Sequence, residues 1–148
     1  MSLKVLEIHH HAMRAASGEK AMQDTLHFYR DVLGMEPDPG RPNFRDAPGY
    51  WFNVGDQGQV HLISLEGPSS FAQGPGKDPT ARHIAFAVAS IAEAKAEVER
   101  LGMPYWSLVA PGAPPHAEML FLNDPNGNMV ELHQIGSCRC NKTGRLSK

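Results

Sequence analysis

The chain has 148 residues, of which 41% are hydrophobic and 20% charged, so it can form one globular domain and is too short for two ordinary ones. Its formal net charge of −2 gives no reason to expect a nucleic-acid partner. It shows neither an apolar run long enough to cross a membrane nor the pattern of a signal peptide. With only two cysteines, both near the C-terminus, we expect a cytoplasmic protein without a disulfide framework.

The first half of the sequence predicts a strand, a helix and further strands. Met22, Leu26, Tyr29 and Leu33 recur with the spacing of one helical face, and Gly34 follows as a stop. The segments on either side contain the short, partly alternating apolar runs that are typical of strands. The expected elements are a strand at 6–15, a helix at 22–33, a further strand at 43–46, and a pair of strands at 50–54 and 59–65.

The second half repeats this order. The tripeptide Leu-Gly-Met at 33–35 recurs at 101–103, again after a helical stripe, which here begins at Ile91. Ser90 and Glu93 form a capping-box signature for the start of this second helix. The expected elements are a strand at 82–89, a helix at 91–101, and strands at 106–109, 117–123 and 128–135.

The repeat predicts an α+β fold of two βαβββ modules, each with one helix-covered and one bare face. Placed together, the bare faces of a partly open sheet enclose a cleft, either within one chain or between modules of two chains. Cys138 and Cys140 in the basic tail are a weak metal-binding candidate. The predicted organisation is a first module at 1–65, a Gly/Pro/Ser-rich linker at 66–80, a second module at 81–136 and a disordered tail at 137–148.

The repeat also aligns four residues with metal-binding side chains. Register set by Leu-Gly-Met and the turn glycines places His10 opposite His83, and His61 opposite Glu131. Side chains alternate between the two faces of a strand, so the apolar neighbours of His83 face the helix and His83 faces the cleft. The same alternation turns His10 toward the cleft and both of its neighbouring histidines away from it.

Three imidazoles and one carboxylate on a common surface are a ligand set for one divalent first-row metal ion, with Fe, Mn, Ni, Co and Zn left open. We therefore expect His10, His61, His83 and Glu131 to bind the ion, with His61 and Glu131 also candidates for acid/base catalysis. Arg14 shares the cleft-facing parity and could bind a substrate carboxylate in a bidentate pair. The alternative for Arg14 is a strand-end side chain that reaches water.

Three motifs, HFYRDVLGM, the strand that contains His83, and FLNDPNGNMVEL, resemble the vicinal oxygen chelate superfamily over about residues 5–135. This superfamily includes glyoxalase I, bleomycin resistance proteins and type I extradiol dioxygenases. The resemblance implies paired βαβββ modules, a divalent metal bound by the first and last strand of each module, a small-molecule substrate and a homodimer. It thereby implies an enzyme that chelates its substrate through neighbouring oxygen atoms.

The resemblance leaves the reaction open. Glyoxalase I-like enzymes usually have a carboxylate where this chain has His61, whereas extradiol dioxygenases have an acid/base histidine there. The dioxygenase signature, however, also places a tyrosine at Phe121 and a histidine shortly before His116. Phe121 would therefore lie on the substrate side of the site but lacks the hydroxyl group that would hydrogen-bond the substrate. We therefore expect a dioxygenase-like or a lyase/isomerase-like enzyme. The alternative is a metal-free ligand-binding protein like the bleomycin resistance proteins, which generally lack the ligand set that this chain has.

Overall fold

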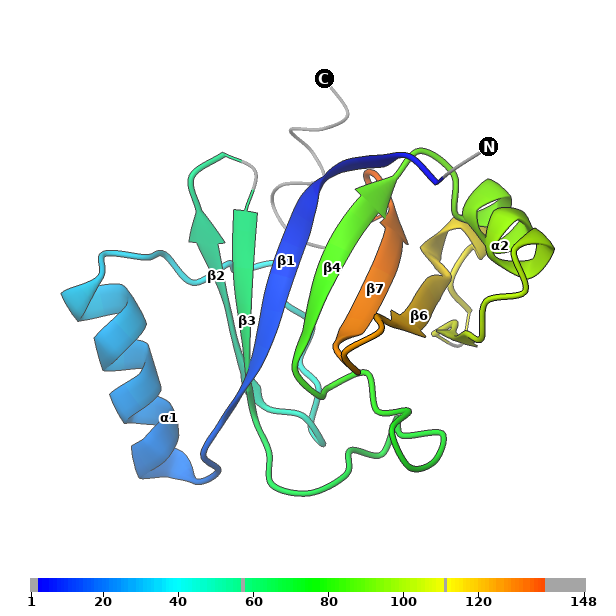
Figure 1. Ribbon diagram of the computed structural model, residues 1–148. Helices are drawn as coiled ribbons and strands as arrows, with labels where there is room; N and C mark the ends of the chain where they lie inside the picture. Colours follow the sequence, from blue (N-terminus) through cyan, green and yellow to red (C-terminus); the bar gives the residue numbers. More distant parts are fainter. Residues whose placement is uncertain (1–2, 57, 111, 138–148) are drawn as a thin grey trace.

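The computed structural model describes residues 3–56, 58–110 and 112–137, and within them seven strands form one mixed sheet (Figure 1). The order across the sheet is β2-β3-β1-β4-β7-β6-β5, which confirms the expected α+β class. The strands are β1 (Val5–Ala15), β2 (Gly49–Val54), β3 (Gly58–Ser64), β4 (His83–Val88), β5 (Trp106–Leu108), β6 (Met119–Asn123) and β7 (Met129–Gln134).

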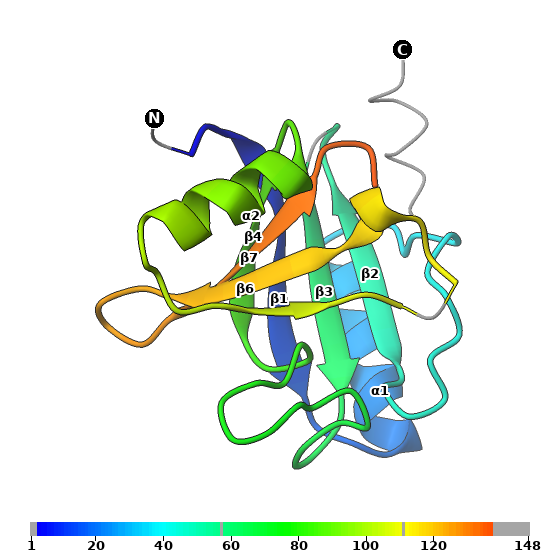
Figure 2. The ribbon, with the colours of Figure 1, turned by 90° about the vertical axis from the view of Figure 1, so that its right-hand side faces the viewer.

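The two halves of the chain meet where β1 pairs antiparallel with β4 at the centre of the sheet. On either side of this pair, β1 runs parallel to β3 and β4 runs parallel to β7, so the halves are arranged alike. The sheet is twisted, and β6 crosses the direction of β2 and β3 at a steep angle (Figure 2). Both modules of one chain therefore contribute to the same sheet surface.

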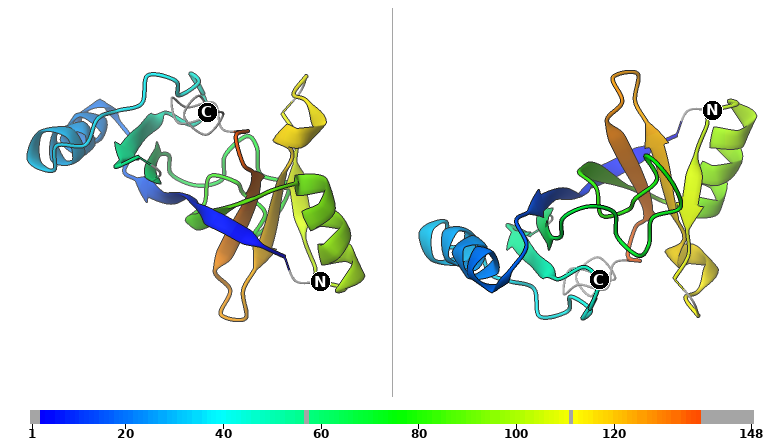
Figure 3. Two further views of the ribbon diagram at one scale, coloured as in Figure 1. Left: turned by 90° about the horizontal axis from the view of Figure 1, so that it is seen from above. Right: turned by 90° about the horizontal axis from the view of Figure 1, so that it is seen from below.

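Three helical segments accompany the sheet. The first is α1 (Glu19–Leu26), which continues as a π-helical segment, η1 (His27–Val32). The other two are α2 (Ile91–Arg100) and a short 3₁₀ segment, η2 (Pro115–Ala117). α1 and α2 lie at opposite ends of the sheet (Figure 3). None of the helices in the described part of the chain is long and apolar enough to cross a membrane.

α2 begins where the sequence predicts, because the Ser90 side chain accepts a hydrogen bond from the Glu93 backbone N–H at 3.2 Å. Its buried face lies against apolar side chains of β4, β6 and β7, including Val88, Leu120 and Leu132. Burying each such aliphatic side chain contributes about 1.5–3 kcal/mol. In the first half, Tyr29 of η1 stacks on Phe52 of β2 with ring centroids 5.1 Å apart. Both helices thus cover the same face of the sheet, and we call the opposite face the inner face.

The expected strand at 43–46 is wrong. Pro37 makes an isolated bridge with Phe52, and the segment that follows is an irregular loop with two short turns until β2 begins. Four prolines between residues 37 and 48 remove backbone donors that a strand ladder needs. Instead, Phe44 and Ala47 pack onto the inner face of the first module. The disorder predicted for the tail at 137–148 and the metal candidate formed by Cys138 and Cys140 fall, apart from residue 137, on residues 138–148, which lie outside the described residues.

Candidate metal centre

Two small residues, Ala12 of β1 and Ala85 of β4, lie fully buried on the inner face near the centre of the sheet. Each alanine has a larger polar residue beside it on both neighbouring strands. Because a methyl group is small, the longer side chains next to it have room to lean over it and approach one another. These side chains are His61 and His83 beside Ala12, and His10 and Glu131 beside Ala85.

Three of the four side chains converge on one point. His83 Nε2 lies 2.7 Å from Glu131 Oε2, and His10 Nε2 lies 3.6 Å from the same oxygen. The two Nε2 atoms of His10 and His83 are 3.1 Å apart. One ligand atom from each residue lies within 4.8 Å of the others, and all three residues are buried. Two imidazoles and one carboxylate in this arrangement form a ligand set for a divalent metal with positions left for substrate.

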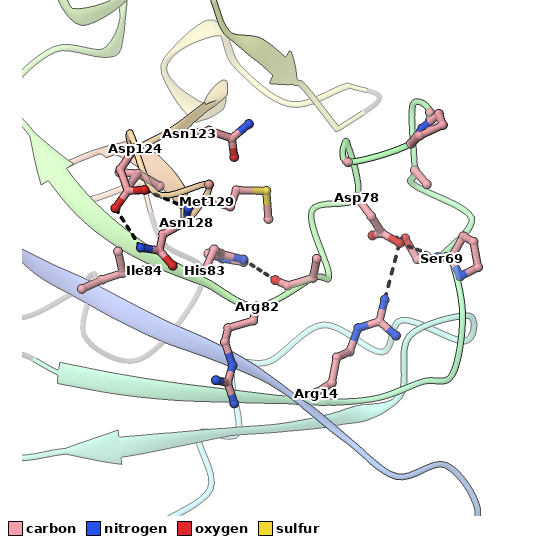
Figure 4. A pocket seen from close by; sticks show the side chains of 18 of the residues that line it. Arg14, Ser69, Asp78, Arg82, His83, Ile84, Asn123, Asp124, Asn128 and Met129 are labelled. Carbon is pink, nitrogen blue, oxygen red and sulfur yellow. Dashed lines mark hydrogen bonds and ion pairs between the residues drawn. The ribbon is translucent and has the colours of Figure 1, made fainter.

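The tautomer of His83 supports this use. His83 Nδ1 lies 2.7 Å from the backbone oxygen of Ala81 and donates its hydrogen to it (Figure 4). A neutral His83 therefore carries its proton on Nδ1 and presents the lone pair of Nε2 to His10 and Glu131. Such a bond from the outer ring nitrogen to a backbone carbonyl is the usual way in which proteins orient a metal-binding histidine.

His61, by contrast, is held away from this point by Gln59, a residue that the sequence analysis missed. His61 Nε2 lies 2.9 Å from Gln59 Oε1, and Gln59 Nε2 donates to Asp38 at 2.9 Å and to Asn53 at 3.0 Å. These two bonds fix the amide so that its oxygen faces His61, which must then carry its proton on Nε2. Gln59 lies two residues before His61, so the alternation of the strand could have identified it.

The ring of His61 lies between two other rings. Trp51 of β2 stacks on one side with a centroid distance of 4.3 Å, and His10 stacks on the other at 3.8 Å. The adjacent Phe52 packs against η1, so Trp51 points to the inner face while its neighbour points to the helix side. The stack restricts His61 to motion within its own ring plane.

Burial and neighbouring charges set the protonation of the cluster. Burial acts to raise the pKa of Glu131, but His133 and His83 outweigh it and hold that pKa well below the ordinary value. Burial lowers the pKa of His10 to about 4, against the opposing effect of Glu131, and lowers the pKa of His61 as well. Burial also acts to lower the pKa of His83, but Glu131 outweighs it and raises that pKa. At neutral pH the carboxylate is ionised while His10 and His61 are neutral, the forms that bind metal ions.

His9 does not follow the expected alternation. We expected it to face away from the cleft, yet it is buried on the inner face beside His10. The cause is a β-bulge: Ile8 pairs with Phe86 and His10 pairs with Ala85, so β1 has one residue more than β4 between these pairs. The extra residue lets two consecutive histidines point to the same side of the sheet.

Arg14 binds the linker between the modules. Its Nε donates to the backbone oxygen of Thr80 at 2.8 Å, and its NH1 group donates to the backbone oxygens of Leu65 and Gly67 at 2.6 and 3.0 Å. The NH2 group donates to the Thr80 hydroxyl at 2.9 Å and faces Asp78 at 3.5 Å (Figure 4). All five N–H groups therefore have acceptors within the chain, and binding a substrate carboxylate would require Arg14 to release some of them.

Phe121 is fully buried on the inner face of β6, where it stacks on Trp106 with a centroid distance of 4.0 Å. Its ring lies edge to face with His83 at 6.1 Å. It therefore forms an apolar wall beside one of the converging ligands, and its contact with substrate stays a prediction. An open hollow of about 1570 Å³ lies beside this region, between the linker, the start of β4 and the turn before β7, and it reaches His83 (Figure 4).

The family model of the Glyoxalase/Bleomycin resistance protein/Dioxygenase superfamily matches residues 8–132 of the chain. The chain belongs to this superfamily. The resemblance stated from the sequence is thereby confirmed, and it accounts for the arrangement of two like modules around a shared inner face. A curated protein of Arabidopsis thaliana, "Glyoxylase I 4", is 25% identical over 123 residues, which cover 82% of this chain and 66% of that protein, or just under two thirds.

Two solved structures of the superfamily fold are similar over most of the chain. Methylmalonyl-CoA epimerase from Mycobacterium tuberculosis has a TM-score of 0.61 at 19% identity, with 88% of each chain covered. The 2,3-dioxygenase LapB from Pseudomonas sp. KL28 has a TM-score of 0.57 at 19% identity, and the match covers 88% of this chain but 41% of that one. At these identities the similarity establishes the fold alone.

Proposed function

We propose that the protein is a divalent-metal-dependent enzyme that acts on a small substrate chelated through two neighbouring oxygen atoms. His10, His83 and Glu131 would hold the ion, and His61 would serve as the acid/base residue. The observation that carries this proposal is the convergence of His10 Nε2, His83 Nε2 and Glu131 Oε2 within 4.8 Å of one another, inside a buried surface.

The donor set fits a divalent ion of the first transition row. The His83 tautomer that Ala81 fixes presents an Nε2 lone pair, and His10 is neutral at physiological pH because its pKa is about 4. Two nitrogen lone pairs and a carboxylate oxygen directed at one point repel each other unless a cation or a proton lies between them. Once bound, such an ion supplies Lewis acidity, which stabilises negative charge that develops on the chelated substrate oxygens.

His61 is suited to proton transfer rather than to coordination through Nε2. Its Nε2 hydrogen is engaged by Gln59, which leaves Nδ1 as the nitrogen that can accept a proton. Burial lowers the pKa of His61 below its ordinary value, so the ring is neutral and able to act as a base at pH 7. The stack with Trp51 and His10 holds the ring in one plane, and the bond to Gln59 orients the ring within that plane, so the two together fix the direction of that lone pair.

Between the two reactions implied by the superfamily, proton-transfer chemistry of the lyase or isomerase kind is better supported than ring-opening dioxygenation. Phe121 stands where the dioxygenase signature has a tyrosine, and its ring is fully buried against Trp106. No hydroxyl from that position can therefore reach a substrate next to His83. Because the fold is shared with both an epimerase and a dioxygenase, it does not discriminate between the two reactions, and an assay must compare them directly.

The test is reconstitution of untagged protein with Fe(II), Mn(II), Ni(II), Co(II) or Zn(II), followed by two assays on each preparation. One assay follows a methylglyoxal–thiol adduct without oxygen, and the other follows a catechol with oxygen. We expect ion-dependent turnover without oxygen, abolished in His83→Ala and retained in the matched control His27→Ala, which changes an exposed histidine of η1.

Three outcomes would overturn parts of this proposal. Oxygen uptake with Fe(II) alone would assign the chain to the dioxygenases. Ion binding that His83→Ala leaves unchanged would place the metal elsewhere. Tight binding of an organic ligand by ion-free protein, without turnover in either assay, would identify a binding module of the bleomycin resistance kind. The expected homodimer stays a prediction that light scattering of the untagged protein measures.

A further inference from the structure

A second group of histidines adjoins the proposed metal site, and we propose that it binds a second divalent ion. The group consists of His9 and His133, and it shares His10 and Glu131 with the first site. One ring nitrogen from each of His9, His10 and His133 lies within 4.8 Å of the others. This site is separate from the function proposed above, which needs one ion only.

The bulge in β1 and the alternation of β7 bring the new pair together. His9 is the residue that the bulge adds to the inner face, and His133 lies two residues after Glu131 and therefore on the same face as that ligand. The His9 and His133 rings stack with a centroid distance of 4.6 Å and an interplanar angle of 17°. Two strands from different modules thus present imidazoles at one place, as β1 and β4 do at the first site, although the His10 and His83 rings there lie at 74° to each other.

The two shared residues each have one atom directed to each site. His10 faces His83 with Nε2 at 3.1 Å and faces His9 with Nδ1, which lies 2.7 Å from His9 Nδ1. Glu131 faces His83 with Oε2, and its other oxygen, Oε1, contacts His133 Nε2. A carboxylate can bridge two metal ions through its two oxygens, and an imidazole can do so through its two nitrogens once it has lost its ring proton.

Glu131 Oε1 gives an independent sign that this position suits a cation. It is fully buried and makes no hydrogen bond of good geometry, although His133 Nε2 lies against it. A buried carboxylate oxygen needs a positive partner; His133 Nε2 lies against it here, and an ion held by His133 and His9 would supply positive charge at the same place. His133 remains 13% exposed, so an ion can approach from the solvent at this end of β7.

The chemistry of the group selects the kind of ion. Three imidazoles and one carboxylate oxygen suit Zn(II), Co(II), Ni(II) or Cu(II) rather than Mg(II) or Ca(II), which prefer oxygen ligands.

The test counts Zn(II) ions retained by untagged protein after equilibrium dialysis, with the metal measured by mass spectrometry. We expect two ions per wild-type chain and one in His9→Gln and in His133→Gln. The control His27→Gln, at an exposed position, keeps two. His83→Ala disrupts the first site, so loss of that ion tests the proposed function independently of the second site.

One ion in the wild type that neither variant alters would overturn the second site and leave the proposed function intact. One ion whose affinity falls tenfold or more in the variants, at unchanged stoichiometry, would also overturn it, because the two histidines would then only orient His10 and Glu131. Cu(II) gives a further readout. Two bridged ions couple magnetically and weaken the paramagnetic resonance signal per ion, and we expect His133→Gln to restore the signal of an isolated ion. If His9→Gln fails to fold by circular dichroism, His133→Gln and His133→Asn decide the question.

Discussion

Replacing Gln59 with leucine tests the idea that this residue holds the acid/base histidine. The substitution keeps the approximate shape of the side chain but removes three hydrogen bonds, the buried bonds to His61 and Asp38 and the part-buried bond to Asn53. Two of them join neutral groups and contribute about 1 kcal/mol each, whereas the bond to the carboxylate contributes about 2 kcal/mol. Added apolar burial returns about 1 kcal/mol, so we expect a net loss of about 3 kcal/mol in the free energy of unfolding.

The assay is urea unfolding of the metal-free protein, with Gln23→Leu as the matched control. Gln23 is exposed on α1 and makes one weak contact at 3.4 Å, so its replacement is expected to change stability by no more than about 0.5 kcal/mol. Nitrogen chemical shifts of His61 give a second readout, because the wild type should show the proton on Nε2 and Gln59→Leu should not. A loss below about 1 kcal/mol with an unchanged His61 tautomer would refute the orienting role.

Three further predictions concern the sheet, the linker and the ion. Gly49→Ala would place a Cβ 1.9 Å from the backbone oxygen of Leu62, so we expect a loss on the order of 3 kcal/mol, and an unchanged melting temperature would contradict it. Partial burial acts to raise the pKa of Asp78, but hydrogen bonds from neighbouring linker residues outweigh it and lower that pKa. Its stabilisation is therefore complete above its usual pKa and is lost as pH falls through the lowered value, so the stabilities of wild type and Asp78→Asn should converge in acid and differ at pH 6. Burial acts to lower the pKa of His83, but Glu131 outweighs it and raises that pKa, so ion binding must displace a proton from His83. Calorimetry should show the affinity for the ion falling about tenfold per pH unit below the pKa of His83. An affinity that does not depend on pH would contradict this.

The sequence predicts most of what positions the site, because the relevant signals are local. Alternation along a strand and a duplicated Leu-Gly-Met bring His10, His61, His83 and Glu131 to one face without knowledge of any long-range contact. The capped start of α2 at Ser90 follows from neighbouring residues in the same way. Whether these four residues bind a metal stays a prediction, since their placement alone does not establish an ion.

The features that escaped prediction depend on contacts between distant segments. The bulge that turns His9 inward arises from the pairing of β1 with β4, and no residue in the first strand signals it. Arg14 donates hydrogen bonds to the linker, and the alternation of side chains along a strand does not predict the path of a linker. The absence of a strand at 43–46 could have been anticipated, because the surrounding prolines are visible in the sequence and conflict with a ladder.

The bulged residue in β1 has a consequence for how such a centre changes during evolution. A substitution on a regular strand can add a functional group only at every second position, and each exchange removes whatever stood there before. Inserting one codon inside the strand instead adds His9 next to His10, and the bulge absorbs the extra residue, so that the strand keeps its pairing and its alternation on either side. An ancestral centre can thus acquire an additional imidazole in one genetic event while every original group keeps its place.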